Sequence, residues 1–150
     1  MNQRRERTTF TVGEEAEITR IISDEDIRRY AGISGDENPV HINEEYAKGT
    51  MFGGCIVPGM LVAALISAVL GNILPGPGSI YVSQQLHFVS PVRPGDQVTA
   101  RVRVMEWIPD KGEIRLRTHA INQNRVIVIT GEATLVMSSF LTKTLKMPGL

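Results

Sequence analysis

The sequence has one cysteine, no excess of charge of either sign, and no apolar run long enough to cross a membrane. Because Cys55 stands alone, an internal disulfide and a cysteine-based zinc cluster are excluded, and a reducing, cytoplasmic location is expected. Lysine plus arginine balance aspartate plus glutamate at 16 each, so no overall field attracts nucleic acid or an anionic membrane. The basic cluster Arg4-Arg5-Arg7 has no interleaved aromatic residues and indicates a solvated tail. These absences predict a protein without a nucleic-acid or membrane partner.

The length and hydrophobic content of the chain set its domain organisation. At 150 residues and 42% hydrophobic content it has the size of one domain with a real core. We expect a single domain over residues 1–150, with 1–13 and 139–150 as tails. The most apolar run, Met60 to Leu70, is about half of the roughly 20 residues that span a bilayer, and the N-terminus has no apolar signal core. This run predicts a buried helix that begins at Gly59 or Met60 and ends at Gly71.

The second half of the chain has the period of β-strands. Glu15–Ile22 predicts one strand, and four further segments are long, rich in Val, Ile and Thr, and largely alternating. These four are Ile80–Val89, Gln97–Ile108, Glu113–Gln123 and Arg125–Met137. An antiparallel sheet with one face to cover, together with a helix that is apolar on all sides, indicates a sheet wrapped around that helix. This α+β layout is the hot-dog fold; the competing layout, a closed barrel, leaves the apolar helix uncovered.

A polar stretch, SGDENPVH, separates two predicted helices in the first half. Ser23 is the expected N-cap of the first helix, which ends between residues 32 and 35, and Asn43 is the expected N-cap of a short helix that stops at Gly49. Pro39 excludes helical geometry for the residue before it. Residues 36–41 are therefore expected to form a shaped loop.

Asp36 and His41 are the candidate acid/base residues of this stretch. A carboxylate and a neutral imidazole on one proline-stiffened loop can hold one water molecule from two sides, as general acid/base chemistry requires. Asn38 can tie the backbone of the loop. The alternative is a simple polar turn followed by a structural or solvated histidine. A metal site that adds His87 or His119 has no supporting spacing, and no metal is expected.

The start of the apolar helix supplies a second polar feature. The bare backbone of Gly59 lets a ligand oxygen approach the unpaired N–H groups of the first turn, where the helix dipole stabilises negative charge on a carbonyl oxygen. Alternatively, Gly59 only provides the bend into the helix. Ser67, about two turns later, either bonds back to the carbonyl of Ala63 or reaches a ligand cavity, and its spacing favours the first.

Four segments of the chain resemble one known family. YAGISGDENPVH at 30–41, followed by Ala47, closely resembles the signature of the (R)-specific enoyl-CoA hydratases, which belong to the MaoC-like dehydratase family. The resemblance continues through VPGMLVAALIS at 57–67, LPGPGSIYVSQQLHF at 74–88 and PVRPGDQVTARV at 91–102, and covers about residues 15 to 137. One departure is Pro58, where many members have a histidine, so any role of that histidine is absent here.

The resemblance implies a fold, an activity and a set of site residues. It implies a hot-dog homodimer or higher homo-oligomer that reversibly adds water to a trans-2-enoyl thioester and gives the (R)-3-hydroxyacyl thioester. No cofactor is implied, because coenzyme A or an acyl carrier enters as part of the substrate. By position, Asp36 and His41 match the catalytic pair and Gly59 matches the N–H that polarises the thioester carbonyl. Asn38 matches a loop-supporting amide, and Ser67 matches a serine near the acyl cavity, which reverses the expectation from its spacing.

Two rival functions keep the same fold. One is a non-catalytic subunit that binds acyl thioesters, and the other is an acyl-CoA thioesterase, which releases a free thiol. Lys111, Arg115 and Arg117 are candidate contacts for the phosphates of the acyl carrier, with plain surface charge as the alternative. Ala63 and Ala64 suggest room for an acyl chain beside the helix.

Overall fold

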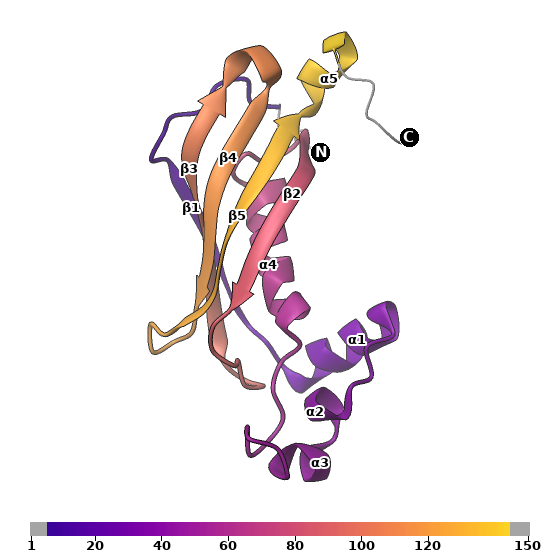
Figure 1. Ribbon diagram of the computed structural model, residues 1–150. Helices are drawn as coiled ribbons and strands as arrows, with labels where there is room; N and C mark the ends of the chain where they lie inside the picture. The colour runs from indigo at the N-terminus through magenta and orange to yellow at the C-terminus, as the bar shows by residue number, and fades with distance from the viewer. Residues whose placement is uncertain (1–5, 145–150) are drawn as a thin grey trace.

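The computed structural model describes residues 6–144, which form an antiparallel sheet with one long helix, α4, along one face (Figure 1). The sheet has the strand order β1-β3-β4-β5-β2, and all neighbours are antiparallel. The strands are β1 (Glu15–Ile21), β2 (Ser79–Phe88), β3 (Gln97–Ile108), β4 (Glu113–Ile121) and β5 (Ile127–Met137). Each matches a predicted strand closely, and the hot-dog layout predicted from the sequence is confirmed.

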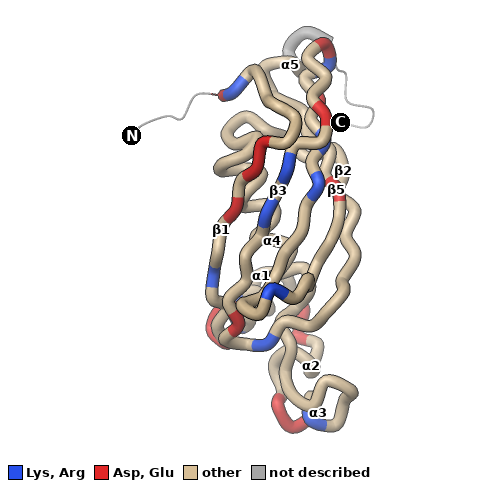
Figure 2. The backbone as a smooth tube through the Cα atoms, turned by 90° about the vertical axis from the view of Figure 1, so that its left-hand side faces the viewer, with Lys and Arg blue, Asp and Glu red and all other residues tan. Residues whose placement is uncertain are grey.

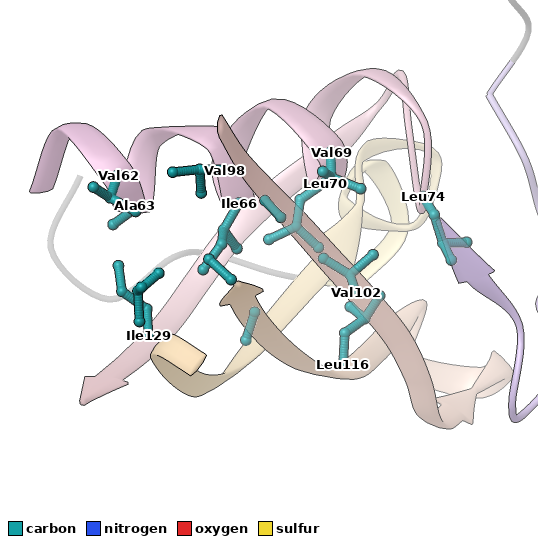
Figure 3. Packing of buried hydrophobic residues seen from close by; sticks show 14 of the residues in the cluster. Val62, Ala63, Ile66, Val69, Leu70, Leu74, Val98, Val102, Leu116 and Ile129 are labelled. Atoms are coloured by element: carbon teal, nitrogen blue, oxygen red, sulfur yellow. The ribbon is translucent and has the colours of Figure 1, made fainter. Parts of the chain in front are cut away.

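The core lies between the sheet and α4 (Gly59–Asn72), which contacts β1, β2, β3 and β4. Four large residues of the helix are buried and face the inner side of the sheet (Figure 3): Val62, Ile66, Val69 and Leu70. Burial of one such side chain contributes about 1.5–3 kcal/mol. The other side of α4 is open, because Met60 is 56% exposed and Ala64 and Ser67 are exposed as well. The prediction that protein surrounds this helix is therefore wrong within one chain, since only one sheet face covers it.

Three short helices lie beyond one end of the sheet (Figure 1). They are α1 (Asp24–Ser34), α2 (Pro39–Ile42) and α3 (Glu44–Lys48). The Ser23 hydroxyl accepts the N–H of Asp26, whose carboxylate accepts the N–H of Ser23 in return, and this capping box begins α1. Gly35, at φ 75°, ends α1, and the Asn43 side chain caps α3 by accepting the N–H of Tyr46. The caps predicted at Ser23 and Asn43 are confirmed. No helix within residues 6–144 has the length and apolar character of a membrane span.

Residues 6–13, predicted as part of a polar tail, pack against the sheet instead. Phe10 is 8% exposed, and its ring centroid lies 4.9 Å from that of Trp107. Glu6 accepts hydrogen bonds from the hydroxyl of Ser138 and the backbone N–H of Ser139. These two serines begin α5 (Ser138–Thr144), which occupies part of the predicted C-terminal tail. A lone phenylalanine in a polar segment has no periodicity, so the sequence pattern did not reveal this contact.

Arg7, also predicted to belong to a solvated tail, is partly exposed but is held by two contacts. Its guanidinium donates to the carboxylate of Glu14 at 2.6 and 3.0 Å and lies over the ring of Phe10, 4.8 Å from the centroid. The hydrogen bond with Glu14 raises the pKa of Arg7 and lowers that of Glu14. Arg4 and Arg5, the other members of the basic cluster, lie outside the described residues.

Candidate active site

The polar stretch forms one turn and one short helix. The Asp36 side chain accepts the N–H of Asn38 at 3.3 Å, and the Asn38 side chain accepts the N–H of Val40 at 3.3 Å. Pro39 then begins α2. The predicted loop is therefore wrong for its second half. Proline fits the first helical position, because an N–H group there has no acceptor within the helix and its absence costs no hydrogen bond. His41 therefore lies on a helix, of one turn, rather than on a loop.

The ring of His41 is held in one tautomer. Its Nδ1 lies 2.8 Å from the carbonyl oxygen of Ile56. A carbonyl oxygen can only accept, so Nδ1 carries the proton and donates it. In the neutral ring Nε2 is then unprotonated and free to accept a proton from a bound water.

The start of α4 presents backbone donors. Pro58 precedes the helix and supplies no side-chain cap, and its carbonyl accepts the N–H groups of Leu61 and Val62. The N–H groups of Gly59 and Met60 have no acceptor within the described part of the chain. These N–H groups lie at the N-terminal end of α4, the positive end of the helix dipole, where an anionic oxygen is stabilised.

One cavity of about 440 Å³ joins these groups, because Asp36, His41 and Gly59 all line it. Its other walls are mostly apolar and come from the loop before α4, from α4 itself, from the end of β2 with the turn that follows it, and from the start of β5. They are Phe52, Ile56, Val57, Met60, Val62, Phe88, Val89, Ser90, Pro91, Val92, Val128 and Ile129. An apolar cavity with a carboxylate, an imidazole and a backbone donor suits a substrate with one carbonyl group and an apolar chain.

Comparison with known proteins agrees with this geometry. A family model described as a MaoC like domain matches residues 6–127. The (R)-specific enoyl-CoA hydratase of Rhodospirillum rubrum is 50% identical over 125 residues, which cover 83% of this chain and 86% of that protein. The 3-hydroxybutyryl-CoA dehydratase of Methylorubrum extorquens is 45% identical over 77% of this chain and 73% of that protein. The solved (R)-hydratase from Aeromonas caviae, involved in PHA biosynthesis, matches with a TM-score of 0.84 and 38% identity over 87% of this chain and 99% of that one.

The chain belongs to the MaoC-like family. The resemblance read from the sequence is thereby confirmed.

The two remaining predicted site residues of this MaoC-like domain lie outside the cavity walls. Asn38 is exposed and caps α2, a position from which it can support the segment that carries Asp36 and His41. Ser67 lines a second cavity, of about 550 Å³, on the open side of α4. Tyr81 lines the same cavity, and its pKa is raised because burial outweighs the opposing effect of Ser67. The structure brings Asp36, His41 and Gly59 together and leaves Ser67 apart from them.

The other histidines do not join the site. His87 and His119 flank Thr130 in the register of the sheet, and together with Arg117 they line a separate cavity. Burial, with a smaller effect of Arg101, lowers the pKa of His119.

The candidate phosphate contacts also lie away from the site. Lys111 and Arg115 flank the hairpin between β3 and β4, at the opposite end of the sheet from α1, α2 and α3 (Figure 1). Arg115 forms ion pairs of 3.2 Å with Glu106 and with Glu113. Such pairing of charges recurs along neighbouring strands, with acidic residues of β1 beside basic residues of β3 (Figure 2). For Lys111 and Arg115 the structure therefore favours plain surface charge over a contact with the phosphates of the acyl carrier.

Sequence reasoning missed the aromatic walls of the cavity. Phe52 lies in the glycine-rich segment before α4, and Phe88 ends β2. Alternation along β2 places Phe88 on the same face as Gln84 and Leu86, but only the position of β2 in the sheet shows that this face meets Gly59. A strand pattern carries no information on which helix residue it opposes.

Proposed function

We propose that this protein is an (R)-specific enoyl-CoA hydratase, a hydro-lyase that reversibly adds water to trans-2-enoyl-CoA and gives (R)-3-hydroxyacyl-CoA. The observation that carries the proposal is that Asp36, His41 and the start of α4 line one shared apolar cavity. The relatives named (R)-specific enoyl-CoA hydratase and 3-hydroxybutyryl-CoA dehydratase support the same reaction type. Addition of water needs no cofactor, because coenzyme A is part of the substrate.

The chemistry follows from the polar groups of the cavity. Asp36 and Nε2 of His41 each accept a hydrogen bond from one water molecule, which gives up a proton to this pair as its oxygen bonds to the β-carbon of the substrate. The thioester oxygen, which gains enolate character, accepts the N–H of Gly59. The pair then delivers a proton to the α-carbon from the same side. Both hydrogens and the oxygen of the water are thus accounted for, and the addition is syn.

Replacement of one carboxylate tests the proposal. Asp36→Asn keeps the size of the side chain and its turn geometry but removes the proton acceptor, so kcat for hydration of crotonyl-CoA should fall by about 10²–10⁴-fold. The matched control is Glu37→Gln, since Glu37 is exposed and does not line the cavity. The loss of the conjugated enoyl absorbance measures the rate. An Asp36→Asn enzyme with wild-type turnover would exclude this assignment.

The same assay separates the two rival functions. A thioesterase would release free thiol from crotonyl-CoA, which a thiol reagent detects, whereas a hydratase removes the enoyl absorbance and releases no thiol. A non-catalytic subunit would show no activity as a purified single chain. Hydration by the purified chain without thiol release is the expected result.

We further propose that two or more copies associate through β2 and the open side of α4, in the cytoplasm. β2 is an edge strand of the sheet, and Tyr81, Val82 and Phe88 on it are 40%, 57% and 54% exposed. An unpaired edge with apolar side chains favours a second strand from another copy. Light scattering during size-exclusion chromatography should give at least twice the mass of 16.5 kDa.

A further inference from the structure

The segment between α3 and α4 determines how the site is assembled. Residues 50–56, here called the 50–56 loop, have no regular secondary structure and include two adjacent glycines. Phe52 and Ile56 form part of the cavity wall. The carbonyl of Ile56 also fixes the tautomer of His41. Any shift of this loop therefore changes both the shape of the cavity and the protonation of the histidine ring.

The 50–56 loop is held from outside by one arginine. Arg93 lies in the turn between β2 and β3, and its guanidinium donates to the carbonyl of Gly54 at 3.0 Å, to that of Cys55 at 3.4 Å and to that of Phe52. In the described part of the chain Arg93 forms no ion pair. Its donors are thus committed to three carbonyl groups of one loop rather than to an acidic side chain.

Both ends of this contact are themselves fixed. The N–H of Arg93 donates to the Asp96 carboxylate at 2.8 Å, and the next residue before it, Val92, accepts the N–H of Val57 at 2.8 Å. On the other side of the loop, the Glu44 carboxylate accepts the N–H of Cys55 at 3.1 Å, and this hydrogen bond lowers the pKa of Glu44. The loop is therefore anchored through its carbonyls by a cation and through one N–H by an anion.

We propose that Arg93 is a positioning residue for the hydration reaction: by holding the carbonyls of the 50–56 loop, it places the Ile56 carbonyl that keeps His41 in its Nδ1-protonated form. Glu44 of α3 also holds this loop, but it is the weaker anchor because it accepts one backbone N–H of the loop, that of Cys55, whereas Arg93 donates to three carbonyl groups. The proposal rests on the proposed function for its kinetic consequence, but its structural consequence can be measured without any substrate.

The chemistry of arginine explains why this residue type is needed. A planar guanidinium presents five donors in a fixed fork, so it can satisfy several carbonyl groups of one loop at the same time. Bonds from a charged donor are stronger than those between neutral groups. A lysine at position 93 would keep the charge but has no fork, so it could not hold the carbonyls of Phe52 and Gly54 in the same arrangement.

The first measurement is of the histidine ring by nitrogen-15 NMR. The three histidines of the sequence give separate ring signals, and His41→Gln identifies that of residue 41. In the wild-type protein His41 should show a protonated Nδ1 and an unprotonated Nε2. In Arg93→Ala and in Arg93→Lys the same signals should move toward a mixture of both tautomers. The control Arg103→Ala removes an arginine that pairs with Glu15 and lines neither the active-site cavity nor the cavity of His87 and His119, and should leave the His41 signals unchanged.

The second measurement is of kinetics with the same variants. Misplacement of a reacting group by about 1 Å can cost about 10²-fold in rate, so both Arg93 variants should lose about 10- to 100-fold in kcat with a smaller change in KM. If Arg93 instead bound the phosphates of coenzyme A by its charge, Arg93→Lys would keep kcat and Arg93→Ala would mainly raise KM. Such a result would overturn the proposal.

The two proposals can fail separately. An unchanged His41 tautomer in both Arg93 variants refutes the positioning role, whatever the activity. If the tautomer shifts in the Arg93 variants but the wild-type protein hydrates no enoyl-CoA, the positioning role is supported and the proposed function is refuted. If Arg93→Ala does not fold, Arg93→Lys and Glu44→Ala provide the same test, and Glu44→Ala should shift the tautomer in the same direction by a smaller amount.

Discussion

Gly59 has no room for a side chain, and this gives a sharp prediction for Gly59→Ala. A Cβ atom at this position would lie 2.7 Å from Cε1 and 2.8 Å from Cδ1 of Phe88. Carbon atoms in contact are separated by about 3.5–4.0 Å, so the ring has to retreat by about 1 Å. Phe88 is 54% exposed and can move. Alanine is favoured over glycine by about 0.5–1 kcal/mol in a helix interior, and Gly59 is the first residue of α4, so this gain is an upper limit and the free energy of unfolding should change by no more than about 1 kcal/mol.

The cost of Gly59→Ala should instead appear in catalysis. Phe88 and Gly59 line the same cavity, so a displaced ring changes the space next to the N–H of Gly59. We expect kcat/KM for crotonyl-CoA to fall by about 10²-fold, the usual effect of a misplacement of this size. Phe88→Leu alone should change kcat/KM only a few-fold, roughly the effect of a minor packing change. The double variant Gly59→Ala, Phe88→Leu should recover most of the loss, because leucine leaves space for the new methyl group.

Two results would contradict this reasoning. Wild-type kcat/KM in Gly59→Ala would show that the substrate does not approach this part of α4. An equal loss with and without Phe88→Leu would show that the ring does not transmit the effect, and that the methyl group itself blocks the backbone donor. Urea denaturation of each variant serves as the control for stability.

Two further predictions concern stability and pH. A Cβ atom at Gly131 would lie 1.9 Å from the backbone oxygen of Gln85 in β2, so Gly131→Ala should destabilise the protein by about 3 kcal/mol or more. A Cβ atom at Gly32, in α1, would have no atom within 4 Å, so Gly32→Ala should stabilise the protein by about 0.5–1 kcal/mol. Urea denaturation measures both changes. Hydrogen bonds from the backbone and hydroxyl of Ser23 lower the pKa of Asp26, so the unfolded chain binds this proton more tightly than the folded one. The stabilisation of the folded state by ionised Asp26 is therefore present above about pH 4 and is lost as pH falls through the folded pKa. Asp26→Asn should reduce the acid dependence of the free energy of unfolding.

Much of the fold could be predicted because its signals are local. Alternation of apolar residues along each strand depends only on the strand itself, and the caps at Ser23 and Asn43 involve partners within three residues. The same local reasoning was right for Asn38, which is not helical, but wrong for the residues after it, because the expected loop extends to residue 41 although Pro39 begins α2. It also failed for Phe10, whose partner Trp107 is distant in sequence.

The candidate site was predictable in part for a related reason. Asp36 and His41 lie on one short segment, and the glycine that begins α4 is visible as a break before an apolar run. That these three residues share a cavity depends on the packing of α1, α2 and α4, which no local pattern specifies. The exposed position of Ser67 has a similar origin, since a helix that is apolar on all sides does not show which side the sheet covers.

The order of the elements explains why the site forms at this end of the sheet. α4 and β2 are consecutive and run in opposite directions (Figure 1), so the end of β2 returns to the start of α4. The turn that follows β2 carries Arg93 back to the 50–56 loop, which immediately precedes α4. The segment before this loop carries Asp36 and His41. Three polar parts of the site therefore meet because one helix and one strand form an antiparallel pair, and the hydrogen bonds of Arg93 and Ile56 convert that proximity into a defined orientation of the His41 ring.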